Sequence, residues 1–140
     1  MSLTRIDHFA IEVRDIEYFV SMLEKTGCLK LIRWGVRGTT GMRIAMLGDG
    51  TGLKIEVAEE PDASEPRLDH VAFRATDIEG DCQSLERAGW EVTIQPRSVP
   101  AAHASSAMLS SENGFGLQLI RYEPTSPDIV EWTASSDELA

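Results

Sequence analysis

The chain is poor in cysteine, in aromatic residues and in positive charge. It has two cysteines, Cys28 and Cys82, among 140 residues, and 6% of its residues are aromatic. The cysteines have no CxxC spacing, so we expect free thiols rather than a disulfide or a cysteine metal site. Its 13 basic residues are outnumbered by 23 acidic ones, which gives a net charge of −10 at pH 7. This balance argues against binding to nucleic acid or to anionic membrane surfaces.

Long hydrophobic runs are also missing. No apolar run approaches the roughly 18–20 residues that cross a bilayer. The first residues lack the basic stretch and apolar core of a signal peptide, so we expect a cytoplasmic protein. The hydrophobic share is 42% and the charged share 26%, which is typical of a globular protein, and the length fits a single domain.

The sequence does contain an internal repeat with a constant spacing of 62 residues. Residues 6–11 read IDHFAI and recur as LDHVAF at residues 68–73, which pairs His8 with His70. The spacing holds to the end of each half, where Glu56 corresponds to Gln118. Other equivalent pairs are Asp15 and Asp77, Gly27 and Gly89, Met46 and Met108, and Gly52 and Gly114. Two half-domains of one architecture are therefore expected.

Each half reads as a strand, a helix and three strands. Alternating apolar residues predict the strands, and Asp15 and Asp77 are typical helix N-caps. The expected strands are 5–13, 28–36, 42–48, 52–58, 68–75, 90–95, 105–110 and 115–122. The repeats run over residues 4–60 and 66–122, followed by a loose tail at 123–140 in which Ile129, Val130 and Trp132 could dock. We predict an α+β fold in which two tandem βαβββ modules form an eight-stranded cup.

Four polar side chains occupy equivalent positions in the two modules. Strand alternation turns His8 and Glu56 to the inner face in the first module, and His70 and Gln118 in the second. Two histidines, a carboxylate and an amide oxygen make a plausible metal shell. Asp7 and Asp69 precede the histidines, so by the same alternation they should point outward and pair at the surface.

These motifs resemble the vicinal oxygen chelate superfamily, which includes glyoxalase I, methylmalonyl-CoA epimerase, extradiol dioxygenases and bleomycin-binding proteins. The resemblance covers residues 4–122 and rests on the Asp-His pair that opens each module and on the Gly-x-x-x-Glu-like element of each last strand. It implies a metal at the centre of the cup, held by His8, Glu56, His70 and Gln118. Glyoxalase I usually has a second Glu where this chain has Gln118, and an Arg that holds a glutathione carboxylate where this chain has Glu12. A glutathione thiohemiacetal substrate is therefore disfavoured.

The resemblance also implies a chemistry. A divalent ion with open positions would be chelated by two neighbouring substrate oxygens and would stabilise an enolate. Glu56, the only carboxylate among the four ligands, is the candidate base. The ligand set suits Zn²⁺, Ni²⁺, Co²⁺, Mn²⁺ or Fe²⁺.

Arginine residues are candidates for binding an anionic substrate group. Alternation along the strand turns Arg74 toward the cup beside His70, opposite Glu12 in the repeat, so both are candidate substrate-binding residues. A structural Glu12–Arg74 ion pair is the alternative. Arg33, Arg37, Arg43 and Arg97 could also supply an anion clamp.

We therefore expect a metal-dependent glyoxalase- or epimerase-like enzyme, a lyase or isomerase, that acts by proton transfer on a small oxygenated carbonyl compound. One alternative is an antibiotic-binding resistance protein that sequesters a ligand in the same cup. A third is an extradiol-type dioxygenase, for which two histidines and one carboxylate on Fe²⁺ would serve. The resemblance implies a small-molecule partner and a homodimer.

Overall fold

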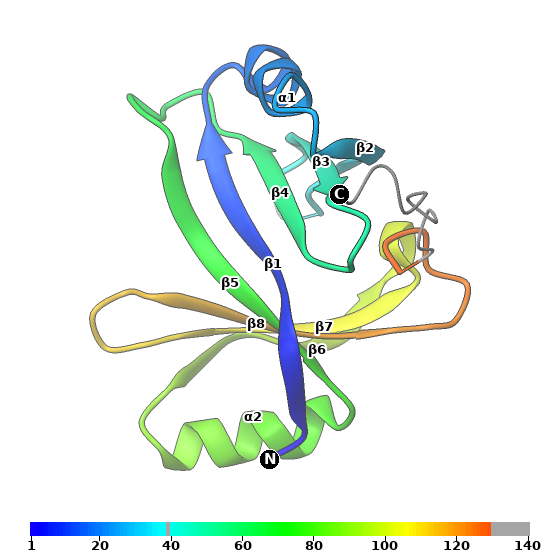
Figure 1. Ribbon diagram of the computed structural model, residues 1–140. Coiled ribbons are helices and arrows are strands. Elements are labelled where there is room, and N and C mark those ends of the chain that lie inside the picture. Colours follow the sequence, from blue (N-terminus) through cyan, green and yellow to red (C-terminus); the bar gives the residue numbers. More distant parts are fainter. Residues whose placement is uncertain (39, 130–140) are drawn as a thin grey trace.

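The strands form one curled sheet, as the computed structural model shows for the residues that it describes, 1–38 and 40–129 (Figure 1). The first module contains β1 (Leu3–Val13), α1 (Ile16–Glu24), β2 (Lys30–Val36), β3 (Arg43–Gly48) and β4 (Lys54–Glu59). The second contains β5 (Arg67–Ala75), α2 (Ile78–Arg87), β6 (Glu91–Val99), a 3-10 turn (Pro100–Ala102), β7 (Ala104–Ser110) and β8 (Gly116–Tyr122). The strand order is β2-β3-β4-β1-β5-β8-β7-β6. This confirms the α+β fold with an eight-stranded cup.

Both helices begin at the expected caps. The Asp15 carboxylate accepts a hydrogen bond from the backbone N–H of Tyr18, and the Asp77 carboxylate accepts one from Gly80. These bonds satisfy backbone donors that the first helical turn leaves free. α1 and α2 lie at opposite ends of the molecule, each beside the strands of its own module (Figure 1). Each helix buries apolar side chains in a separate core cluster with those strands.

The two modules meet at the antiparallel pair β1 and β5 in the middle of the sheet. In this pair Phe9 lies opposite Val71, its own equivalent in the repeat. The pseudo-twofold axis that relates the modules therefore passes between these two residues. His8 and His70 are each one residue from the axis, and their cross-strand partners are the small residues Ala72 and Ala10. A site shared by both modules is thus built within one chain.

Two segments differ from the expectation. β6 continues to Val99, past the expected end at residue 95. The strand accommodates Pro96 because its pairing with β7 shifts register between Ile94 and Arg97. Residues 123–129 do not extend loosely, since Ser126 and Asp128 are buried and the Asp128 carboxylate pairs with Arg33 of β2. Val130 and Trp132, named as possible docking residues, lie outside the described residues.

Across the described part of the chain, no helix is long and apolar enough to span a membrane.

Candidate metal centre and its cavity

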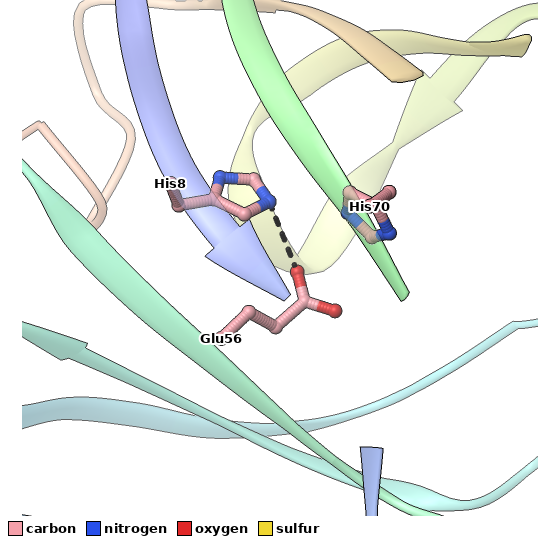
Figure 2. Close-up of side chains that lie close together, drawn as sticks. All are labelled: His8, Glu56 and His70. Carbon is pink, nitrogen blue, oxygen red and sulfur yellow. Dashed lines mark ion pairs between the residues drawn. The ribbon is translucent and has the colours of Figure 1, made fainter. Parts of the chain in front are cut away.

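His8, Glu56 and His70 converge on the inner face of the cup. Each offers one potential ligand atom, and these atoms all lie within 4.8 Å of one another. The His8 Nε2 atom is 3.3 Å from a Glu56 carboxylate oxygen, and Figure 2 shows His70 beside this pair. β1 and β4 run parallel with Ala10 beside Glu56, which places the carboxylate next to the axis. The structure therefore brings together three of the four expected ligands from three strands.

Gln118, the fourth expected ligand, joins them from β8. Its side-chain oxygen is 3.1 Å from His70 Nε2, and its amide N–H donates to the Ser106 hydroxyl at 2.7 Å. In this orientation of the amide, its oxygen faces His70 and its nitrogen faces Ser106. Ser106 was not a candidate in the sequence, because a serine on a strand carries no distinguishing signal.

Asp7 does not point outward as alternation predicted. The pairing of β1 with β5 shifts register between Ile6 and His8, so Asp7 is the additional residue of a β-bulge. A bulge re-aims side chains, and here it turns Asp7 into the protein, where it is fully buried. Its carboxylate lies 2.6 Å from His8 Nδ1. Asp69 makes the equivalent contact with His70 Nδ1 at 2.7 Å but remains partly exposed.

Arg74 and Glu12, the candidate substrate-binding residues, do not pair with each other. Arg74 Nε donates to Asp7 at 2.8 Å, whereas Glu12 pairs with Arg37 and Arg67. The pseudo-twofold axis explains the separation. Glu12 lies three residues from the axis in one direction and Arg74 three residues in the other, so they sit at opposite ends of the β1/β5 pair. Neither belongs to the described residues that line the cavity.

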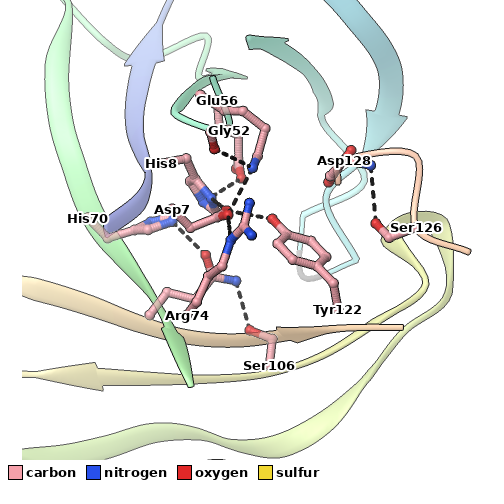
Figure 3. Close-up of polar contacts among 12 residues, drawn as sticks. Asp7, His8, Gly52, Glu56, His70, Arg74, Ser106, Tyr122, Ser126 and Asp128 are labelled. Atoms are coloured by element: carbon pink, nitrogen blue, oxygen red, sulfur yellow. Dashed lines mark hydrogen bonds and ion pairs between the residues drawn. The ribbon is translucent and has the colours of Figure 1, made fainter. Parts of the chain in front are cut away.

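Asp7 is the centre of a buried polar network behind His8 (Figure 3). Lys54 Nζ donates to the carboxylate at 2.8 Å, and the Tyr122 hydroxyl also donates to it. Lys54 is 2% exposed. It could have been found in the sequence, because it lies two residues before Glu56 and thus faces the same side of β4. Tyr122 gives no such signal.

Burial and hydrogen bonding set the protonation of this region. Burial opposes ionisation of Asp7, but His8 and Lys54 outweigh it and hold the pKa of Asp7 well below its usual range. Burial and the Asp7 charge raise the pKa of Tyr122, so its hydroxyl remains a donor. Burial disfavours protonated His8, but Asp7 and Glu56 outweigh it and raise the pKa of His8 to about 9. The His8 charge in turn outweighs burial and lowers the pKa of Glu56 to about 2.

The donor set fits a divalent metal ion. Each histidine is held at Nδ1 by an aspartate, so the lone pair of a deprotonated Nε2 is directed at the Glu56 or Gln118 oxygen. In the metal-free site the raised pKa of His8 keeps a proton on the ring beside Glu56. A divalent cation would displace that proton, because it would be held by the four acceptor atoms that then face one another. His8 Nε2 is buried and, apart from its 3.3 Å ion pair with Glu56, has no hydrogen-bond partner among the described residues, so it is available to ligate a metal.

The four residues lie in the wall of a cavity of about 240 Å³. Strands β2 and β6 are the two edges of the sheet, yet residues of both line this cavity. The curl of the sheet therefore closes the cup around the site. Apolar residues make up part of the wall, and its charged members other than the ligands are Arg33, Arg37, Asp69, Arg97 and Asp128. Arg43, another residue considered for the anion clamp, instead pairs with Glu17 and Glu59.

A curled sheet of paired modules with a His-Glu-His cluster at its centre defines the class of protein. The sequence matches the model of the Glyoxalase/Bleomycin resistance protein/Dioxygenase superfamily over residues 7–108, and the chain belongs to this superfamily. No protein in the curated set matches the sequence significantly.

Solved structures share the fold. Methylmalonyl-CoA epimerase from Mycobacterium tuberculosis has a TM-score of 0.76 and 19% identity, over 87% of this chain and 90% of that one. A methylmalonyl-CoA epimerase in complex with methylmalonyl-CoA and NH4+ has a TM-score of 0.75 and 23% identity, over 89% and 99%. A variant of the Streptomyces coelicolor epimerase with bound 2-nitronate-propionyl-CoA has a TM-score of 0.73 and 24% identity, over 86% and 99%.

Proposed function

We propose that this protein is a divalent-metal-dependent isomerase or lyase that moves a proton next to the carbonyl group of a small oxygenated substrate. The observation that carries the proposal is the group of ligand atoms from His8, Glu56 and His70, within 4.8 Å of one another in a cavity wall. The Gln118 oxygen would complete the set. When bound, the metal would supply a Lewis acid that stabilises negative charge on substrate oxygens.

Each of the chain's own residues has a distinct part in this proposal. His8 and His70 would hold the ion through Nε2, while Asp7 and Asp69 fix their rings through Nδ1. Gln118 offers an oxygen but cannot take up a proton. Glu56 is the remaining group that can, so we assign it the role of base at the carbon next to the carbonyl.

The epimerase relatives support the isomerase reading. Two of them are complexes with methylmalonyl-CoA and with 2-nitronate-propionyl-CoA, and their folds match 89% and 86% of this chain. A cavity of about 240 Å³ is small beside typical ligand sites of roughly 300–1,000 Å³. The cavity therefore suits an acyl group bound at the metal, and a larger group attached to that acyl group, such as coenzyme A, would lie outside the cavity.

Glu56→Gln tests the assignment. The substitution keeps an oxygen near the metal but removes the base, so we expect metal to be retained and turnover to be lost. The measurement is exchange of substrate protons with D₂O, followed by NMR, on a panel of 2-alkylmalonyl thioesters, hydroxyketones and hemithioacetals with metal-loaded protein. Glu59→Gln on the same strand, whose carboxylate pairs with Arg43, is the matched control and should exchange normally. Full exchange by Glu56→Gln would refute the role of Glu56.

Sequestration of a cationic antibiotic is the alternative function. The charges of the cavity wall do not favour it over catalysis, because the three arginines Arg33, Arg37 and Arg97 are balanced by the carboxylates of Glu56, Asp69 and Asp128. A wild-type protein that binds metal but catalyses exchange on no member of the panel would favour a binding role.

A further inference from the structure

Arg97 reaches the cavity because of an irregularity in its strand. On β6, Ile94 lines the cavity, so regular alternation would turn residues 96 and 98 inward. Instead the pairing with β7 shifts register between Ile94 and Arg97, and Arg97 and Val99 line the wall. Bulges occur often beside active sites, where they re-aim a side chain. Here the bulge places a guanidinium group at the cavity.

Other charges in the cavity wall already have partners. The Glu56 and Asp69 carboxylates lie against His8 and His70. Arg33 donates to Asp128 through Nε at 2.7 Å and through Nη2 at 2.9 Å. Arg37 pairs with Glu12 at 3.0 Å.

Arg97 differs from these residues. Within residues 1–38 and 40–129 it has no hydrogen bond or ion pair. Its side chain is exposed at the cavity, so its positive charge is solvated and no described residue competes with a ligand for it. On the opposite edge strand, Arg33 Nη1 is buried and likewise has no hydrogen-bond partner in the described part of the chain. A Cβ at position 35 would lie 2.8 Å from this atom, so Gly35 provides the room for it. The cup thus has guanidinium groups on both edge strands in addition to the metal ligands.

We infer that Arg97 binds a carboxylate of the substrate, at a distance from the oxygens that chelate the metal. This rests on the proposed function and names its substrate class, a small carbonyl compound that carries a separate carboxylate. A guanidinium group suits this role because its planar N–H groups can bind a carboxylate through two hydrogen bonds. A carboxylate fits better than a phosphate because the small cavity must also hold the chelating end.

Two hydroxamates, one with a carboxylate and one without, provide the test. Acetohydroxamate chelates a divalent metal through two neighbouring oxygens, and succinate monohydroxamate adds a carboxylate to the same group. Their affinities for metal-loaded protein are measured by calorimetry, and metal content is checked after each titration. The proteins are wild type, Arg97→Gln, Arg97→Lys, and the control Arg121→Gln. Arg121 is an exposed residue of β8 whose side chain, among the described residues, contacts the Thr76 carbonyl alone.

We expect wild type to bind succinate monohydroxamate more tightly than acetohydroxamate. Arg97→Gln should weaken binding of the carboxylate probe about tenfold to a hundredfold, as for a hydrogen bond between charged groups, and leave acetohydroxamate unchanged. Arg97→Lys should fall between, and Arg121→Gln should match wild type. If Arg97→Gln affects both probes equally or neither, the inference is overturned while metal chelation stands. If neither probe binds metal-loaded wild type, the chelating site itself fails, and with it the inference.

Discussion

At the scale of single residues, the site depends on how two imidazole rings are held. Each ring is fixed at Nδ1 by the aspartate that precedes it in the chain. The two aspartates differ in environment, however. Asp7 is fully buried and bound by Lys54 and Arg74, whereas the Asp69 side chain is 33% exposed. The same Asp-His motif therefore has a structural function in the first module that it lacks in the second.

Asparagine substitutions should separate these two functions. Asp69→Asn should weaken metal binding by roughly 10–100-fold, the usual effect of losing a carboxylate behind a ligating histidine, with little loss of stability. Asp7→Asn should weaken it similarly and also destabilise the fold by about 3–5 kcal/mol, because Lys54 and Arg74 lose a buried counter-charge. Competitive metal titration and urea denaturation of the metal-free proteins measure the two effects. Equal stability of the two variants would contradict this account of Asp7.

At the scale of elements, regular strands were predictable and irregular ones were not. The alternating pattern located all eight strands and the inward positions His8, Glu56, His70 and Gln118. It fails at Asp7, which a bulge turns into the protein, and it predicts that β6 ends at residue 95, short of Arg97. Bulges depend on pairing between strands that lie far apart in the sequence, so the pattern of a single strand does not reveal them.

Close contact between β5 and β8 should make Gly116 sensitive to substitution. A Cβ at this position would lie 2.6 Å from the Asp69 carbonyl oxygen and 3.0 Å from His70 Cβ. Because the obstacle includes backbone, the strands must move apart, so Gly116→Ala should destabilise the fold by about 1–3 kcal/mol and displace His70. Gly38→Ala, where a Cβ would meet no described residue within 4 Å, is the matched control beside the cavity. Urea denaturation that shows equal stability for both variants would argue against this packing.

At the scale of the whole molecule, the repeat predicts the site because the two modules are related by a pseudo-twofold axis. The equivalent strands β1 and β5 lie on either side of this axis. His8 and His70 approach each other since each is one residue from the axis, and their ring centroids are 5.6 Å apart. The same symmetry separates Glu12 from Arg74, so equivalence in the repeat predicts contact only near the axis. The register that decides this distance is set by the β1/β5 pairing and could not be known from the spacing of the repeat alone.

The central claim is that the two modules hold one divalent metal ion between them. The most direct measurement is the metal content of protein purified without chelator and supplied with Zn²⁺, Ni²⁺, Co²⁺ or Mn²⁺, for wild type, His8→Ala, His70→Ala and His103→Ala. His103 is exposed and serves as the control. We expect about one ion per chain in wild type and in His103→Ala, with loss in both His8→Ala and His70→Ala. Wild type that takes up none of these ions, or variants at His8 and His70 that keep it, would contradict the account.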